Sequence, residues 1–391
     1  MRALYALWAL LFVCLGLCIA VLGPSIPAFR DEFGVSLAGA GVLFTVHSCG
    51  YLGGVLVAGP LADRRGRRLV AAIGAVGLLV GTALAALAPG WGWFLGAMVP
   101  SGIGFAFTDV ALNAAIGDAV TDARRRAAAM NLLHGAFPLG TLVAPAALAV
   151  AWQLGATWRH AFVAIAGVIA LALPALLVGR PRWPAHAPHE ADSGGLGVLR
   201  LLREPRLVRL AALQGLYVGV ELGIPGWLAT YLIDGFGASV GVGAIATSAY
   251  WGGFLAGRPA VAWLTHRYEP GRVVFRLLIL AVAAAAAGVI APGPTWAAAA
   301  YVVAGVAICG VFPTVMAVAL HDRPRDSGAV AALITAAASL GGLTWPWLVG
   351  AVADGAGVRA AMATAGAPLL AMIALARSMD SAGVAQDADT L

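Results

Sequence analysis

Apolar stretches of membrane-spanning length recur along the whole chain, and this feature restricts the fold more than any other. A helix needs about 20 mostly apolar residues to cross roughly 30 Å of hydrocarbon. The composition agrees, because only 11% of the 391 residues are charged, whereas water-soluble domains carry about a quarter. The first stretch is too long for a cleaved signal peptide and is interpreted as a helix. The sequence therefore predicts an all-α membrane protein with twelve transmembrane helices, over residues 4–27, 38–60, 69–89, 92–116, 127–150, 159–179, 206–232, 240–264, 273–291, 295–319, 327–350 and 357–377.

The arginines predict how the chain is oriented in the membrane. All 24 basic residues are arginines. With both termini in the cytoplasm, only Arg30, Arg159 and Arg359 fall in outer loops, which is the asymmetry expected of a multi-pass protein of the plasma (inner) membrane. The net charge of +6 is then explained by topology and by contact with anionic lipids, and it gives no reason to expect nucleic acid. The four cysteines lie inside predicted helices without metal-ligand spacing, so no metal is expected.

Two pairs of matching segments indicate that six helices have been duplicated. The segment "GYLGG" at 50–54 matches "AYWGG" at 249–253, and "LGTLVAP" at 139–145 matches "LGGLTWP" at 340–346, at offsets of 199 and 201 residues. An even number of helices per repeat leaves both halves in the same orientation, as in parallel repeats. The expected organisation is an N-terminal six-helix bundle (1–179), a cytoplasmic linker (180–205), a C-terminal six-helix bundle (206–378) and a disordered C-terminal tail (379–391).

The turn between the second and third predicted helices is densely charged. Its sequence, "GPLADRRGRR" at 59–68, resembles the signature loop of the major facilitator superfamily, G-x-L-x-D-x-x-G-R-[KR]. The resemblance implies two pseudo-symmetric six-helix bundles, transport by alternating access, and a cytoplasmic gate in which Asp63 meets the positive N-terminal end of the helix at 327–350. The arginines would then pair with Asp118 or Asp122. The alternative, an ordinary positively charged loop, leaves the aspartate and the two glycines unexplained. The residues of this gating motif are Gly59, Asp63, Arg64, Gly66, Arg67, Arg68 and Asp118.

Ionisable residues deep in the predicted helices point to the functional site. Each costs roughly 2.5 to 3.5 kcal/mol at the centre of a membrane helix on insertion scales. Of the 18 acidic residues, only Asp109 and Glu221 lie well inside predicted helices, and the family resemblance places both on helices that line a central cavity. His134 is expected at a depth similar to that of Asp109. His47 is either a packing residue or a further proton carrier. The predicted proton-coupling residues are Asp109, Glu221, His134 and His47.

A second resemblance concerns the subfamily. Four segments are similar to the fucose permease and glucose/mannose proton symporter group: "MNLLHGAFPLG" at 130–140, "GLYVGVELGIPGWLATYL" at 215–232, "YWGGFLAGR" at 250–258 and "GVFPT" at 310–314. In that group an acid follows a G-x-G in the fourth helix and takes the proton, and Asp109 after "GIG" at 102–104 matches it. The first helix lacks the acid of the fucose permease, so a two-acid scheme would use Glu221. The arginine typical of many drug antiporters is also missing, the matching residue being about Met98.

These features predict a proton-coupled secondary transporter. The sequence has no phosphate-binding loop for ATP and no nucleophile with a base inside a helix, so neither an enzyme nor a cofactor is expected. The expected substrate of a monomeric symporter is a small neutral hydroxylated solute such as a sugar; the alternative is export of a drug or metabolite against protons. An organic anion is disfavoured because no basic residue is expected at the midplane, Arg258 being placed near the inner end of its helix. The predicted substrate-binding residues are Asn113, Asn131, Gln214, Tyr217, Glu221, Trp227 and Tyr231.

Overall fold

The computed structural model describes residues 2–120, 129–130, 133–177, 183, 200–323 and 326–379, and all regular structure in these ranges is helical. Ten of the described segments are long and apolar enough to cross a membrane. The helix α11 (Val240–Arg267) and the segment ending in α16 (Gly366–Ala376) complete a set of twelve. The all-α membrane fold predicted from the sequence is confirmed.

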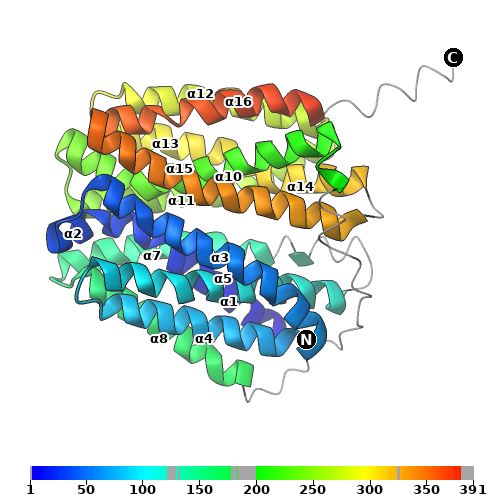
Figure 1. Ribbon diagram of the computed structural model, residues 1–391. Coiled ribbons are helices and arrows are strands. Elements are labelled where there is room, and N and C mark those ends of the chain that lie inside the picture. The colour runs from blue at the N-terminus through cyan, green and yellow to red at the C-terminus, as the bar shows by residue number, and fades with distance from the viewer. Residues whose placement is uncertain are drawn as a thin grey trace. The chain divides into compact units, whose positions relative to one another are not determined.

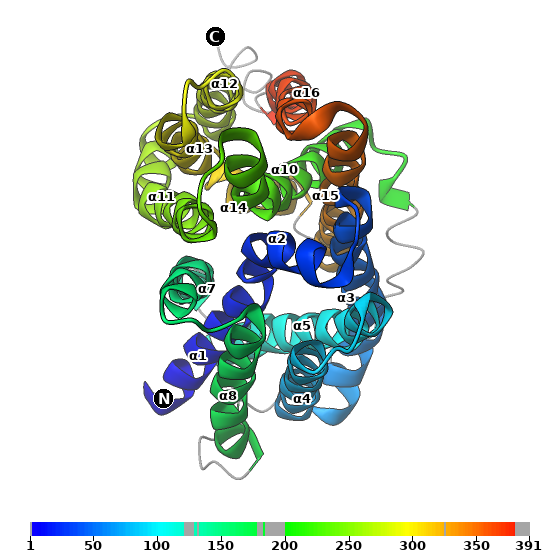
Figure 2. The ribbon, with the colours of Figure 1, turned by 90° about the vertical axis from the view of Figure 1, so that its left-hand side faces the viewer.

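The first half of the chain contains six of these spans (Figure 1). They are α1 (Arg2–Ala20) with α2 (Leu22–Phe33), then α3 (Leu37–Arg65), α4 (Arg67–Ala86), α5 (Trp91–Ala119), α7 (Ala136–Gln153) and α8 (Trp158–Leu177). The first span is interrupted at Val21 because Pro24 has no N–H to donate to the Ala20 carbonyl. In Figure 2, α4 lies against α5 and α8, α3 against α5, and α1 against α7.

The second half contains the other six spans. They are α10 (Pro205–Phe236), α11, α12 (Pro270–Val289), α13 (Pro294–Ile308) with α14 (Val311–Asp322), and α15 (Ser327–Ala363) followed by α16. The sequence predicts one helix over 295–319, but it divides at Cys309 and Gly310, because Pro313 cannot donate to the Cys309 carbonyl. Inside α15, Gly357 has a φ of 84°, a conformation suited to glycine. This break separates the two spans expected at 327–350 and 357–377.

Close glycine contacts repeat in the two halves. In the first half, Gly16 of α1 and Gly140 of α7 approach so closely that a Cβ on either residue would meet the backbone of the other helix. In the second half, Gly215 of α10 and Gly341 of α15 make the equivalent contact, with each residue about 200 positions after its counterpart. Only glycine lets two helix backbones come this close. The matching contacts confirm the pseudo-symmetric bundles inferred from the duplicated segments.

The described chain forms two compact units. The first comprises residues 1–190 with 226–248, and the second comprises 191–225 with 249–391. The boundaries fall at Pro225 inside α10 and at Ser248 inside α11, so each of these helices contributes to both units. Most of the expected linker, and all but the first residue of the expected tail, lie outside the described residues.

Candidate functional site

A partly buried carboxylate is the centre of a hydrogen-bonded group in the first unit. Asp109 and Asn113 lie one turn apart on α5, so their side chains share a face of the helix. The Asn113 amide nitrogen donates to the Asp109 carboxylate oxygen Oδ1 at 2.8 Å and to the Asp109 backbone oxygen at 2.9 Å. The structure thus brings together the two polar residues that the sequence places on one face.

His134 joins this group through Asn113. Its ring atom Nε2 lies 2.7 Å from the Asn113 side-chain oxygen, and the ring packs on Phe12 with centroids 4.7 Å apart. His134 also interacts electrostatically with Asp109. The sequence predicted His134 at a depth similar to that of Asp109, and the structure links the two residues through Asn113.

Tyr51 is a member of this group that the sequence did not reveal. It lies on α3, and its hydroxyl donates to the second carboxylate oxygen of Asp109, Oδ2, at 3.0 Å. Tyr51 stands in the segment "GYLGG" that marks the duplication, and this position does not by itself show that the side chain meets Asp109. Both carboxylate oxygens of Asp109 therefore accept a hydrogen bond, one from α3 and one from α5 itself.

His47 lies one turn before Tyr51 on α3. It is 5% exposed, and its Nε2 atom has no hydrogen-bond partner among the described residues. Its ring meets Phe105 edge-on at 5.8 Å, and Phe105 also contacts Tyr51 at 5.7 Å. Phe105 thus packs against both His47 and Tyr51. The role of His47 in proton coupling stays a prediction.

A second polar group lies in the second unit. Gln214, Tyr217 and Glu221 follow one another at three- and four-residue spacing on α10, and the first two are fully buried. Neither polar atom of the Gln214 amide has a hydrogen-bond partner among the described residues. The Tyr217 hydroxyl is close enough to interact with the Glu221 carboxylate, but the two groups do not reach the geometry of a full hydrogen bond. Buried polar atoms without partners are uncommon and call for an explanation such as a ligand or water.

Two residues of α11 extend this group. Tyr250 is fully buried, lies within electrostatic reach of Glu221, and has a hydroxyl without a hydrogen bond to the described residues. It occupies in the second half the position that Tyr51 occupies in the first, 199 residues earlier. Arg258 stacks over Phe254 at 5.0 Å and interacts electrostatically with Glu221. The sequence placed Arg258 near the inner end of its helix and did not predict its electrostatic interaction with Glu221.

The remaining predicted substrate ligands are more scattered. Trp227 and Tyr231 are buried on α10 after Pro225, at 2% and 1% exposure, and belong to the first unit. Tyr231 packs edge-on against Phe236 at 5.3 Å. Asn131 lies outside the described residues. The two aromatic ligands expected from the sequence are thus buried, and Tyr231 contacts another aromatic ring.

The gating motif forms a compact turn with a bridging arginine. Gly66 joins α3 to α4 with a φ of 91°, a conformation that explains why glycine is needed there. The side chain of Arg67 is only 6% exposed; it forms an ion pair with Asp63 and another with Asp118 of α5, the latter at 3.0 Å. The structure therefore ties together the ends of three helices, α3, α4 and α5, through one guanidinium group.

The other residues of the gating motif differ in how they are held. Arg68 donates to the Leu176 carbonyl of α8 at 2.6 Å, and Arg64 is exposed. A Cβ on Gly59 would meet nothing within 4 Å in the described structure, so packing gives no reason for this glycine. Asp63 belongs to the first unit and α15 to the second, and their contact stays a prediction. Asp122 lies outside the described residues.

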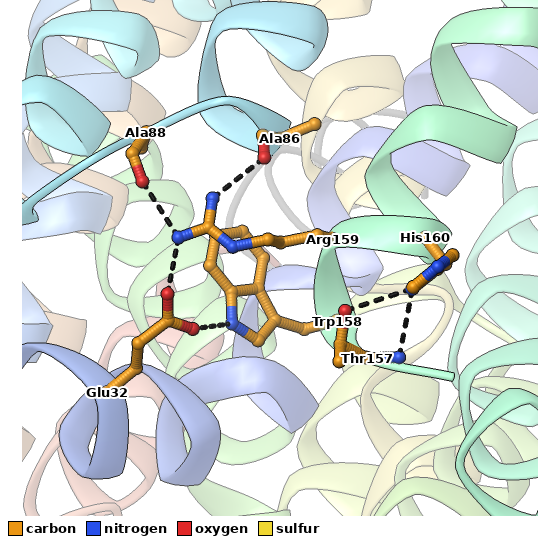
Figure 3. A network of polar contacts seen from close by, with 7 residues as sticks. All are labelled: Glu32, Ala86, Ala88, Thr157, Trp158, Arg159 and His160. Carbon is orange, nitrogen blue, oxygen red and sulfur yellow. Dashed lines mark hydrogen bonds and ion pairs between the residues drawn. The ribbon is translucent and has the colours of Figure 1, made fainter. Parts of the chain in front are cut away.

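The three arginines that the sequence analysis assigns to outer loops all have partners in the structure. Arg159 forms an ion pair with Glu32 and donates to the carbonyls of Ala86 and Ala88 at 2.8 Å each, at the end of α4 (Figure 3). Its guanidinium lies 4.4 Å from the Trp158 ring centre. Cations near a helix C-terminus are favoured by its dipole. This network links α2, the end of α4 and the start of α8.

The other two of these arginines also contact helix ends. Arg359, 200 residues after Arg159, donates at 3.0 Å to the carbonyl of Val289, the last residue of α12. Arg30 at the end of α2 forms an ion pair with Asp234 at the end of α10, at 2.6 Å. The spacing of 200 residues between Arg159 and Arg359 matches the offset of the duplicated segments, which is consistent with the similar contacts of these two arginines. In the described parts of the chain, no group of three or more His, Cys, Asp or Glu side chains could hold a metal ion.

Curated relatives match about half of the chain. The multidrug resistance protein MdtL of Klebsiella pneumoniae (strain 342) is 31% identical over 186 residues, which is 47% of this chain and 47% of that protein. The chain thus spans about half the length of the curated relatives it matches. Related MdtL proteins of Escherichia coli match at 31–32% identity over 41% of each chain.

Solved structures match over nearly the whole length. A D-xylose-proton symporter has a TM-score of 0.78 at 16% identity, covering 97% of both chains. A variant of the E. coli fucose:proton symporter has a TM-score of 0.68 at 20% identity, covering 96% of this chain and 98% of that one. At these identities the likeness concerns the fold. The family model described as Major Facilitator Superfamily matches residues 8–346. Together with the twelve helices and the signature loop, this match shows that the chain is a multi-pass membrane protein belonging to the major facilitator superfamily.

Proposed function

We propose that the protein is a proton-coupled symporter that moves a small neutral hydroxylated solute, such as a sugar, by alternating access. The observation that carries the proposal is the Asp109 carboxylate held by Tyr51 and Asn113 inside a membrane helix. A charged carboxylate is costly at this depth, whereas its protonated form is neutral. A group that gains and loses one proton there can couple proton entry to the conformational cycle.

The polar group around Glu221 suits a hydroxylated substrate. Gln214, Tyr217 and Tyr250 offer both hydrogen-bond donors and acceptors that have no partners among the described residues. Leaving such atoms unpaired costs about 1–3 kcal/mol each, and a ligand with several hydroxyls would satisfy them. Arg258 balances the charge of Glu221, so a neutral solute fits better here than an ion. Trp227, Tyr231, Asn113 and Asn131 complete the proposed set of substrate-binding residues.

The gating motif and the topology complete the proposal. Asp63 closes the cytoplasmic side by meeting the N-terminal end of α15, and Arg67 holds Asp63 in place through their ion pair. His134 and His47 assist Asp109 in proton coupling. The protein acts as a monomer in the plasma (inner) membrane, with both termini in the cytoplasm and its arginines in contact with anionic lipids. The two functional bundles are residues 1–179 and 206–378, joined by the linker 180–205.

Proton-driven export is a second candidate, favoured by one observation. The relatives that match half of the chain are described as multidrug resistance proteins. Export and uptake use the same fold and differ in whether the proton and the solute cross in opposite directions or together. The second candidate therefore predicts the opposite direction of proton movement.

Two measurements test the proposal. The first is a thermal-stability screen of the purified protein with sugars, polyols and cationic drugs, because a ligand at 100 times its Kd stabilises the native state by about 2.7 kcal/mol. We expect a sugar or polyol to raise the melting temperature of the wild type and of Thr344→Val, a control at an exposed site. Gln214→Leu, which keeps volume but removes the amide, should lose the shift. A response to cationic drugs alone would overturn the substrate class.

The second measurement follows protons in vesicles loaded with the solute found by the screen. A symporter moves protons with the solute, so the compartment that the solute leaves becomes more alkaline. Acidification of that compartment would establish the export mechanism and reject symport.

A further inference from the structure

Both carboxylate oxygens of Asp109 are engaged by neutral hydrogen-bond donors, and this arrangement depends on the charge of Asp109. Tyr51 donates to Oδ2 at 3.0 Å and Asn113 donates to Oδ1 at 2.8 Å. An ionised carboxylate can only accept hydrogen bonds, so it satisfies both donors at once. A protonated carboxyl is neutral and has lost one acceptor site, so it accepts these two hydrogen bonds less strongly than the ionised form does.

The orientation of Asn113 requires a hydrogen on one ring nitrogen of His134. Because the Asn113 nitrogen faces the Asp109 carboxylate, its oxygen faces His134, and this oxygen can only accept. The His134 Nε2 atom, 2.7 Å away, must therefore carry a hydrogen. The neutral amide between the two titratable groups has no proton that it readily gives up, so it does not pass a proton from Asp109 to His134.

We propose that Tyr51 and Asn113 are positioning residues that favour the ionised form of Asp109, and that His134 acts on Asp109 by its charge across the Asn113 amide. This inference rests on the proposed role of Asp109 as the proton site. Under this inference Tyr51 stabilises the charge of Asp109, a role that its position in the segment "GYLGG" did not indicate. It also gives Asn113 a structural task in addition to any contact with substrate.

Few other groups near Asp109 could stabilise its ionised form. α5 packs against α3, α4 and α1. The titratable groups that interact with Asp109 in the described residues are Tyr51 and His134, and His47 lies one turn away on α3 with Phe105 packed against it. The hydrogen bonds of Tyr51 and Asn113 are thus the contacts to alter.

The test is an infrared titration of the purified protein, which needs no substrate. The carboxylic-acid C=O band that disappears in Asp109→Asn reports protonation of Asp109. We expect Tyr51→Phe, which keeps the ring against Phe105, to move the midpoint of this band toward higher pH by about one unit, the effect of losing one hydrogen bond to a charged group. The matched hydroxyl deletion Tyr5→Phe, near the start of α1, should leave the midpoint in place.

Two further variants keep the inference testable if Tyr51→Phe does not fold. Asn113→Leu removes the other donor and should shift the midpoint in the same direction. His134→Gln keeps a donor for Asn113 but removes the charge, and should also raise the midpoint. If His134 instead received the proton, this variant would slow proton release and leave the midpoint unchanged.

The outcomes separate this inference from the proposed function. An unchanged or lowered midpoint in both Tyr51→Phe and Asn113→Leu overturns the positioning role while Asp109 can still be the proton site. If no carboxylic-acid band depends on Asp109 at any pH at which the protein is folded, the proposed proton site itself is wrong.

Discussion

The buried guanidinium of Arg67 gives a stability prediction that can be worked out from its surroundings. The exposed fractions are 6% for the side chain of Arg67, 11% for Asp118 and 42% for Asp63. Removing one partner of a buried ion pair costs about 3–5 kcal/mol, because a charge is left unpaired. A pair with a largely exposed partner contributes about 1 kcal/mol or less. The ion pairs of Arg67 with Asp118 and with Asp63 should therefore differ several-fold in their contribution to the free energy of unfolding.

The perturbation is replacement by alanine, and the assay is thermal unfolding of the purified protein in detergent. We expect Arg67→Ala and Asp118→Ala each to lower the free energy of unfolding by about 3 kcal/mol, and Asp63→Ala to lower it by less than about 1 kcal/mol. The double variant Arg67→Ala/Asp118→Ala should be less destabilised than the sum of its single changes, since neither charge is left alone. Equal effects of Asp63→Ala and Asp118→Ala, or additive behaviour of the double variant, would refute the reasoning.

Three further predictions follow from the gate, the helix contacts and the second polar group. Asp63→Asn should leave the protein folded but make engineered cysteines beside the motif easier to label from the cytoplasm; unchanged labelling with normal transport would reject the gate. Gly341→Ala should destabilise the protein by about 1–3 kcal/mol through its contact with Gly215, whereas Gly355→Ala on the same helix, where a Cβ meets nothing within 4 Å, should be neutral or stabilising; equal melting temperatures would contradict this. Glu221→Gln should weaken solute affinity equally in exchange and in proton-driven uptake, and a loss confined to proton-driven uptake would assign Glu221 to the proton instead.

Local patterns were sufficient to predict the elements and part of the site. The lengths of the apolar stretches predicted twelve helices, and the four-residue spacing of Asp109 and Asn113 predicted that they share a face. The motif glycine Gly66 was singled out by its place in the signature loop, and its φ of 91° supplies the physical reason. These inferences depend on residues close together in the sequence, where helix geometry alone fixes the relation.

Contacts between helices could not be predicted in the same way. Tyr51 reaches Asp109 because Gly50 and Gly102 allow α3 and α5 to approach closely, and this register follows from packing of both helices. Arg258 was assigned to the inner end of α11 by counting residues along the helix. It interacts electrostatically with Glu221, and this interaction between two helices does not follow from counting residues along one of them.

The central claim is that Asp109 carries the proton that drives transport. It is tested most directly in proteoliposomes containing wild type or Asp109→Asn, using the solute identified by the stability screen. For one proton per solute, a gradient of about one pH unit supports about tenfold accumulation, since both correspond to about 1.4 kcal/mol. We expect the wild type to accumulate the solute, and Asp109→Asn to bring it only to equal concentrations while still exchanging it between equal pools. Accumulation by Asp109→Asn with the pH dependence of the wild type would contradict the account.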